Sequence, residues 1–99
     1  MKQLNKSTIK LSLYQAIASL KNTTETMDFL HDLCTPAELQ AMSDRWQVVV
    51  PIVQGMPYRQ ISEETGVSVT TVGRVARCLR YGSGAYLKIL KRIKKGRAS

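Results

Sequence analysis

The sequence predicts an all-α fold of six helices, with a helix-turn-helix at about residues 57–79. Apolar residues recur every three or four positions along most of the chain, and residues that begin or end helices flank these segments. No segment alternates apolar and polar residues as a half-buried strand does. With 99 residues, 43% of them apolar, we expect residues 1–99 to form a single domain with a small core.

The first predicted helix, residues 8–20, is apolar on two sides. One stripe includes Leu13 and Ile17, and a second includes Leu11 and Tyr14. A single small chain has little interior with which to cover both stripes. We therefore expect an intermolecular partner to cover one of them, and a dimer would relieve the limited core of the single chain.

Two capping signals mark the beginnings of the next helices. Asn22 followed by Glu25 resembles a capping box, and Thr35-Pro36-Ala37-Glu38 combines a hydroxyl cap, a first-turn proline and a returning carboxylate. The third helix is expected to continue to Gly55, with Trp46 on its core side.

Pro51 interrupts the pattern of this third helix. Proline has no N–H to donate to the carbonyl of Gln47, and its ring clashes with that carbonyl, at a cost of about 3 kcal/mol. We expect a kink or an early last turn at this point.

The helix-turn-helix consists of two short predicted helices joined at Gly66. Ile61 and Thr65 mark the inward side of the first, and the glycine ends it because glycine adopts a left-handed conformation without strain. Ser68 is a natural N-cap for the second. The apolar side of this second helix is made by Val72, Val75, Ala76 and Leu79.

The opposite face of the second helix carries side chains that suit a duplex. Threonine hydroxyls reach base edges or phosphates, and arginines bind guanine or phosphate with two N–H groups. The candidate DNA-binding residues here are Ser68, Val69, Thr70, Thr71, Gly73, Arg74 and Arg77. Helical hairpins that bind only protein have similar apolar spacing, so a helical adaptor with a basic docking face is the alternative.

The distribution of charge also favours double-stranded DNA as the partner. The chain carries a net charge of +8, and residues 67–99 hold nine basic and no acidic side chains. The excess begins at the proposed recognition helix, where a phosphate-binding surface belongs. For the basic residues after Arg80, a solubilising face is the competing interpretation.

Composition argues against several other classes. The sequence has no membrane-length apolar run and no signal-peptide pattern, so we expect a cytoplasmic protein without membrane contact. Cys34 and Cys78 are too few for a zinc site and are interpreted as buried apolar residues. No carboxylate pair, nucleophile set or phosphate loop is in register, which predicts no enzyme activity, no catalytic residues, no metal and no cofactor.

Four stretches carry a family resemblance: Leu33-Cys34-Thr35-Pro36 through Arg45, Gly55-Met56, Gly66, and Arg74 through Leu79. Over these, about two-thirds of its length, the chain resembles the bacterial Trp repressor superfamily. The stretch Arg80-Tyr81-Gly82-Ser83-Gly84-Ala85-Tyr86 is similar to the YerC/YecD-type branch.

The resemblance implies an intertwined homodimer of six-helix chains that regulates transcription, as a repressor, from a roughly palindromic operator. Two recognition helices would enter successive major grooves about one helical turn apart. By position, the DNA-facing residues of the family match Arg59, Val69, Thr70, Thr71 and Gly73. Ser62 stands where the family has a lysine at the DNA.

The resemblance also implies an effector pocket. In the tryptophan-binding repressors two arginines sandwich the indole ring and a threonine helps to hold the ligand. Thr35, Arg45 and Arg74 match these positions, whereas Val75 replaces a small glycine and Cys78 replaces a serine. Valine adds bulk where the ring would lie, and overpacking costs about 1–3 kcal/mol. We expect that this chain does not bind tryptophan, and that its small-molecule effector, if it has one, is smaller than tryptophan.

Overall fold

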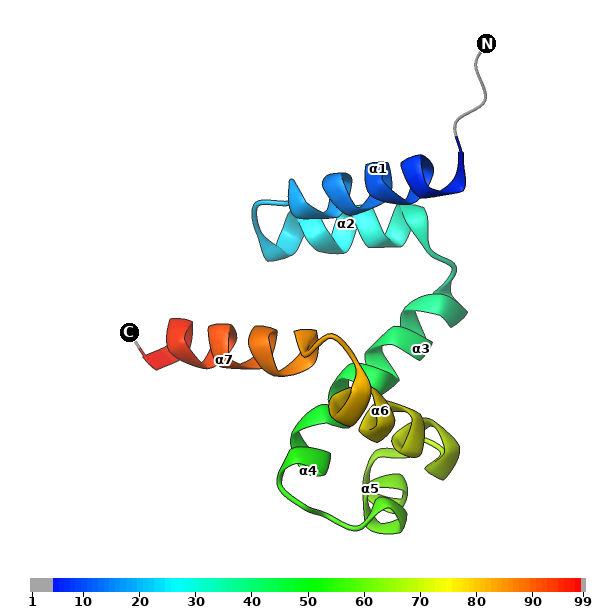
Figure 1. Ribbon diagram of the computed structural model, residues 1–99, viewed down its shortest axis with the longest axis vertical. Coiled ribbons are helices and arrows are strands. Elements are labelled where there is room, and N and C mark those ends of the chain that lie inside the picture. The colour runs from blue at the N-terminus through cyan, green and yellow to red at the C-terminus, as the bar shows by residue number, and fades with distance from the viewer. Residues whose placement is uncertain (1–4, 99) are drawn as a thin grey trace. The chain divides into compact units, whose positions relative to one another are not determined.

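The computed structural model describes residues 5–98, and every regular element in that range is a helix (Figure 1). This confirms the all-α class. The chain divides into two compact units, Met1–Leu39 and Gln40–Ser99, and each is described by itself. The single domain expected over residues 1–99 stays a prediction.

The first unit contains α1 (Lys6–Ala18) and α2 (Thr23–Leu33), joined by a short connection. An asparagine caps each helix. Asn5 accepts a hydrogen bond from the N–H of Thr8, and Asn22 accepts one from the N–H of Glu25, both at 2.8 Å. No described residue of α1 or α2 is buried within this single chain, and most of the large apolar side chains on the two helices are exposed.

The start of α3 (Pro36–Gln47) has the capping box that the sequence predicts. Thr35 donates its backbone N–H to the carboxylate of Glu38 at 2.8 Å, and its hydroxyl accepts the N–H of Glu38 at 3.1 Å. These bonds, the backbone one foremost, lower the pKa of Glu38 because they stabilise the charged carboxylate.

The long third helix of the prediction is divided in two, so residues 5–98 form seven helices where six were predicted. α3 ends at Gln47, and α4 (Val49–Val53) contains Pro51. Proline cannot donate to the Gln47 carbonyl, which explains the expected break. The N–H of Met56 then bonds to the carbonyl of Pro51 at 3.0 Å and closes α4.

The helix-turn-helix consists of α5 (Tyr58–Thr65) and α6 (Val69–Tyr81), and α7 (Ala85–Ala98) follows it. Gly66, at φ 79°, turns the chain sharply at the end of α5. The Thr65 hydroxyl donates to the carbonyl of Ile61 at 2.6 Å and accepts the N–H of Val67 at 3.1 Å. One side chain therefore braces the turn from both sides.

The core of the second unit lies between α4, α5 and α6. Its buried residues are Val48, Val49, Ile61, Val67, Val72 and Val75. Tyr86 and Leu90 of α7 pack against this cluster. The cluster fixes the angle between α5 and α6, and so holds the outward face of α6 in place.

Two expectations about the interior are wrong for the single chain. Trp46, predicted in the core, is 39% exposed and stacks on Tyr86 with ring centroids 6.3 Å apart. Cys78, predicted as a buried apolar residue, is exposed, and Cys34 is half-buried. The single small core is too limited to cover the apolar side chains at these positions.

Candidate nucleic-acid interface

The outward face of α6 begins at a strong N-cap. The hydroxyl of Ser68 accepts the N–H of Thr71 at 3.1 Å, and extended backbone at Ser68 leads into the helix. Val69 is 48% exposed, and Thr70 is exposed beside it. The start of α6 therefore projects from the core with its side chains open to solvent.

The other sequence-predicted residues lie along or beside this face. Arg59 is exposed near the start of α5, while Thr71 and Gly73 are half-buried. Arg74 and Arg77 are exposed one turn further along α6. Candidate residues therefore come from both helices of the motif, and all of them lie in the second unit.

The arginines on α6 are available to an anion. Among the described residues, neither Arg74 nor Arg77 forms an ion pair or a side-chain hydrogen bond within the chain. The later basic residues lie on a different helix: Lys88, Lys91, Arg92, Lys94 and Lys95 are all exposed along α7. The positive charge is therefore divided between α6 and α7.

A small hollow of about 150 Å³ lies between α5 and α6, and several of its residues were not predicted. Gly73 and Arg77 line it together with Tyr58, Arg80 and Tyr81. Gly73, Arg77 and Arg80 are four and three residues apart, which places them on one side of a helix. This spacing is the feature of the sequence from which their grouping could have been predicted. Tyr58 joins them only through the packing of α5 on α6.

Gly73 has no partner that requires its small size. A Cβ atom built there would meet nothing within 4 Å in the chain. Glycine inside a helix costs about 0.5–1 kcal/mol relative to alanine. The open space above Gly73 lets another molecule approach the helix backbone closely.

The proposed effector residues differ in exposure. Arg74 and Cys78 are exposed and Arg45 is half-buried, all in the second unit. Val75 is only 1% exposed and belongs to the core cluster. Thr35 lies in the first unit, where its hydroxyl caps α3.

Neither a membrane-spanning helix nor a cluster of metal ligands is present among residues 5–98. Within residues 5–98, no helix combines the length and apolar character needed to cross a bilayer. In the same part of the chain, no three His, Cys, Asp or Glu side chains gather as metal ligands.

Comparisons with known proteins agree with this geometry. The family model for the Trp repressor protein matches residues 10–94. YerC of Bacillus subtilis (strain 168) is 43% identical over 82 residues, which cover 83% of this chain and 79% of YerC.

Two solved structures are similar over nearly the whole chain. A proposed Trp repressor from Staphylococcus aureus has a TM-score of 0.81 at 40% identity, covering 91% of this chain and 89% of its own. A TrpR-like protein from Eubacterium eligens has a TM-score of 0.83 at 37% identity, with 90% and 92% covered. This chain belongs to the Trp repressor family, in the YerC-type branch.

Proposed function

We propose that this protein is a sequence-specific transcriptional repressor that binds a roughly palindromic DNA operator as a homodimer. The Trp repressor family consists of DNA-binding regulators, not enzymes, and its members form dimers. The observation that carries the proposal is the exposed face of α6. Ser68, Thr70, Arg74 and Arg77 are exposed there, the space above Gly73 is open, and the two arginines have no ion pair or side-chain hydrogen bond among the described residues.

Each residue has a proposed role on the duplex. Thr70 and Val69, in the first turn of α6, would meet base edges in the major groove, where hydroxyl and apolar contacts distinguish base pairs. Arg59, Thr71, Arg74 and Arg77 would bind phosphates and so fix the register. Arg80 and Tyr58, which line the small hollow beside Gly73, extend this phosphate surface.

The proposed dimer follows from uncovered apolar surface. On α1, Ile9, Leu11 and Tyr14 are 53%, 54% and 59% exposed in the single chain. Covering them with a second copy would remove this area from water, at about 25 cal/mol per Å². Two copies would also provide two recognition helices for the two half-sites of an operator.

Tryptophan is not the proposed effector. The side chain of Val75, which stands at the family's glycine position, fills the core with Val72. Admitting an aromatic ring there would require this packed side chain to move, and overpacking costs about 1–3 kcal/mol.

Selection of duplexes from a random pool, followed by fluorescence anisotropy on the enriched sequence, tests the function. We expect two related half-sites with centres about 10 base pairs apart. Thr70→Ala should weaken base preference, and Arg74→Gln should lower affinity for all sequences. Arg92→Gln, a matched exposed arginine on α7, should change affinity less.

The alternative class, a helical adaptor, predicts a different result. Capture of partners from a nuclease-treated lysate would then yield a stoichiometric acidic protein, bound to the basic face of α7, with DNA adding nothing. Absence of an enriched duplex at low salt, together with such a partner, would reject the repressor.

A further inference from the structure

A second hollow lies next to the small one and shares a wall with it. It has a volume of about 550 Å³ and is bounded by α4, the following loop, α6 and the start of α7. Tyr58, Ala76 and Arg80 line both hollows. Its volume lies in the range of about 300–1,000 Å³ typical of small-molecule sites.

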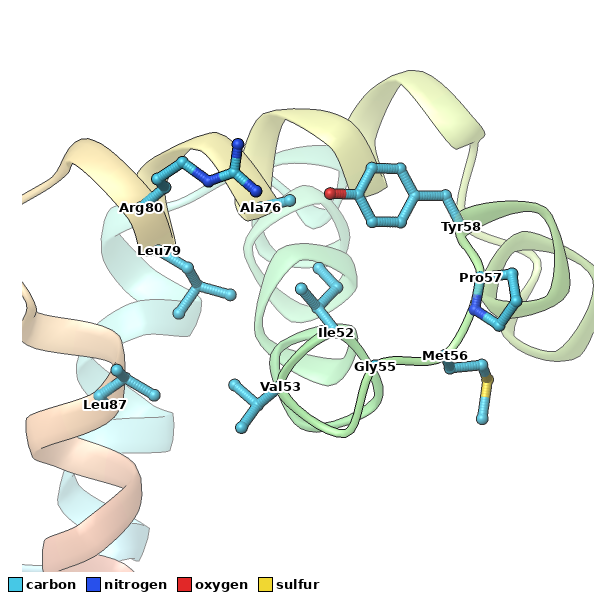
Figure 2. Close-up of a pocket in the computed structure, with 10 residues that line it drawn as sticks. All are labelled: Ile52, Val53, Gly55, Met56, Pro57, Tyr58, Ala76, Leu79, Arg80 and Leu87. Atoms are coloured by element: carbon cyan, nitrogen blue, oxygen red, sulfur yellow. The ribbon is translucent and has the colours of Figure 1, made fainter.

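The lining of the larger hollow is apolar at one end and polar at the other. Ile52, Val53, Leu79 and Leu87 form the apolar part, and their side chains surround the open space in Figure 2. At the rim, the Tyr58 hydroxyl and the Arg80 guanidinium point toward one another past Ala76 (Figure 2).

The two polar groups at the rim are not used inside the chain. The structure gives neither Tyr58 nor Arg80 a side-chain hydrogen bond or ion-pair partner among the described residues. A guanidinium and a hydroxyl on the wall of the same hollow form a donor set that matches a carboxylate. No acidic side chain lines this hollow to compete for the site.

The hollow is also separate from the effector residues inferred by resemblance. On a helix, successive residues are 100° apart, so Ala76 and Arg80 lie on one flank of α6 while Arg74 and Cys78 lie on another. Neither Arg74 nor Cys78 lines the larger hollow.

We propose that the larger hollow binds a small apolar monocarboxylate. Its hydrocarbon part would lie on Val53, Leu79 and Leu87, and its carboxylate would accept hydrogen bonds from Arg80 and Tyr58. Because Arg80 also faces the small hollow proposed for a DNA phosphate, the bound acid would neutralise that arginine and weaken DNA binding. This second step rests on the proposed function, whereas the binding of the acid does not.

Calorimetric titration of the full chain, without DNA, tests the site. The probes are 3-phenylpropionate and its uncharged analogue 3-phenylpropanamide. We expect the acid to bind at least tenfold more tightly than the amide, and Arg80→Gln to remove this difference. Arg77→Gln is the matched control, because Arg77 lines only the small hollow and should leave binding of the acid unchanged.

A variant of the apolar wall gives an independent check. Val53 is 53% exposed, so Val53→Glu should fold normally, as circular dichroism will show, while its carboxylate repels the acid. Equal affinity for acid and amide, or unchanged binding by Val53→Glu, would overturn the site. Failure of 3-phenylpropionate to bind at millimolar concentration would overturn it too, and would be the result if a second copy of the chain fills the hollow.

The regulatory step is measured separately by DNA anisotropy with saturating 3-phenylpropionate. The acid should weaken operator binding of the wild type and leave that of Arg80→Gln unchanged. Unaltered wild-type affinity would overturn the regulatory step while the titration still reports on the site. Absence of any DNA binding would reject the proposed function instead.

Discussion

The Ser68 hydroxyl donates a hydrogen bond to the hydroxyl of Thr71 at 3.0 Å and accepts one from the N–H of that residue at 3.1 Å. As the acceptor in the first bond, the Thr71 hydroxyl keeps its own proton for another acceptor, such as a phosphate oxygen. Ser68 therefore both begins the recognition helix and orients a side chain proposed to meet DNA.

Substitutions of Ser68 separate these two roles. Ser68→Ala should lower the free energy of unfolding by about 1 kcal/mol, because the N-cap is lost, and should weaken DNA binding. Ser68→Asp keeps a capping oxygen and should retain stability, but its charge should repel phosphates. Urea denaturation and DNA anisotropy measure the two effects, with Ser68→Asn as an uncharged control. An aspartate variant that binds DNA like the wild type would place Ser68 away from the phosphates.

The arginines of α6 should determine the salt dependence of DNA binding. Each phosphate contact contributes about 0.9 to the slope of log affinity against log salt concentration. Arg74→Ala or Arg77→Ala should therefore flatten the slope by about 2 in a dimer, one unit per copy. Anisotropy titrations from low to moderate salt measure the slope. A slope unchanged in both variants would contradict the proposed phosphate contacts.

Charged residues on α1 should dissociate the dimer. Leu13 and Ile17 are 37% and 42% exposed in the single chain, and we predict that the partner covers them. Leu13→Glu with Ile17→Glu would bury two unpaired carboxylates at that interface, which is strongly unfavourable. Sedimentation velocity should then show a monomer, whereas Lys10→Glu, an exposed control on the same helix, should remain dimeric. A double variant that sediments like the wild type would refute this interface.

Acid should weaken the cap of α3. The pKa of Glu38 is lowered in the folded chain, so the carboxylate stabilises the fold above the ordinary glutamate pKa of about 4.3. This contribution is lost as the pH falls through the lowered folded pKa. The difference in urea midpoint between wild type and Glu38→Ala should therefore shrink from pH 6 to pH 3. The difference in urea midpoint between Glu38→Gln, which keeps a capping group, and Glu38→Ala should stay constant over this pH range, because neither variant carries the carboxylate. A constant difference between wild type and Glu38→Ala would exclude the mechanism.

Local features were predictable because they depend on neighbours in sequence. The turn at Gly66, the cap at Ser68, the capping box at Thr35 and the break near Pro51 each follow from one residue type at one place. The helix-turn-helix was accordingly predicted at about 57–79, and the structure has it over Tyr58–Thr65 and Val69–Tyr81.

Features that depend on the packing of helices were harder to predict from the sequence. Periodicity identifies the apolar side of a helix but not what covers it, which is why Trp46 and Cys78 were placed inside and are exposed in the single chain. The two hollows were not predicted because Tyr58 and Arg80 are far apart in sequence and line the same hollows only when α5 packs on α6.

Native mass spectrometry of the protein on its selected duplex tests the central claim most directly, since it counts chains on DNA. We predict two chains per operator, with complex formation that declines steeply as salt is raised. A single chain on each duplex, or no complex at low salt, would contradict a dimer that presents paired recognition helices.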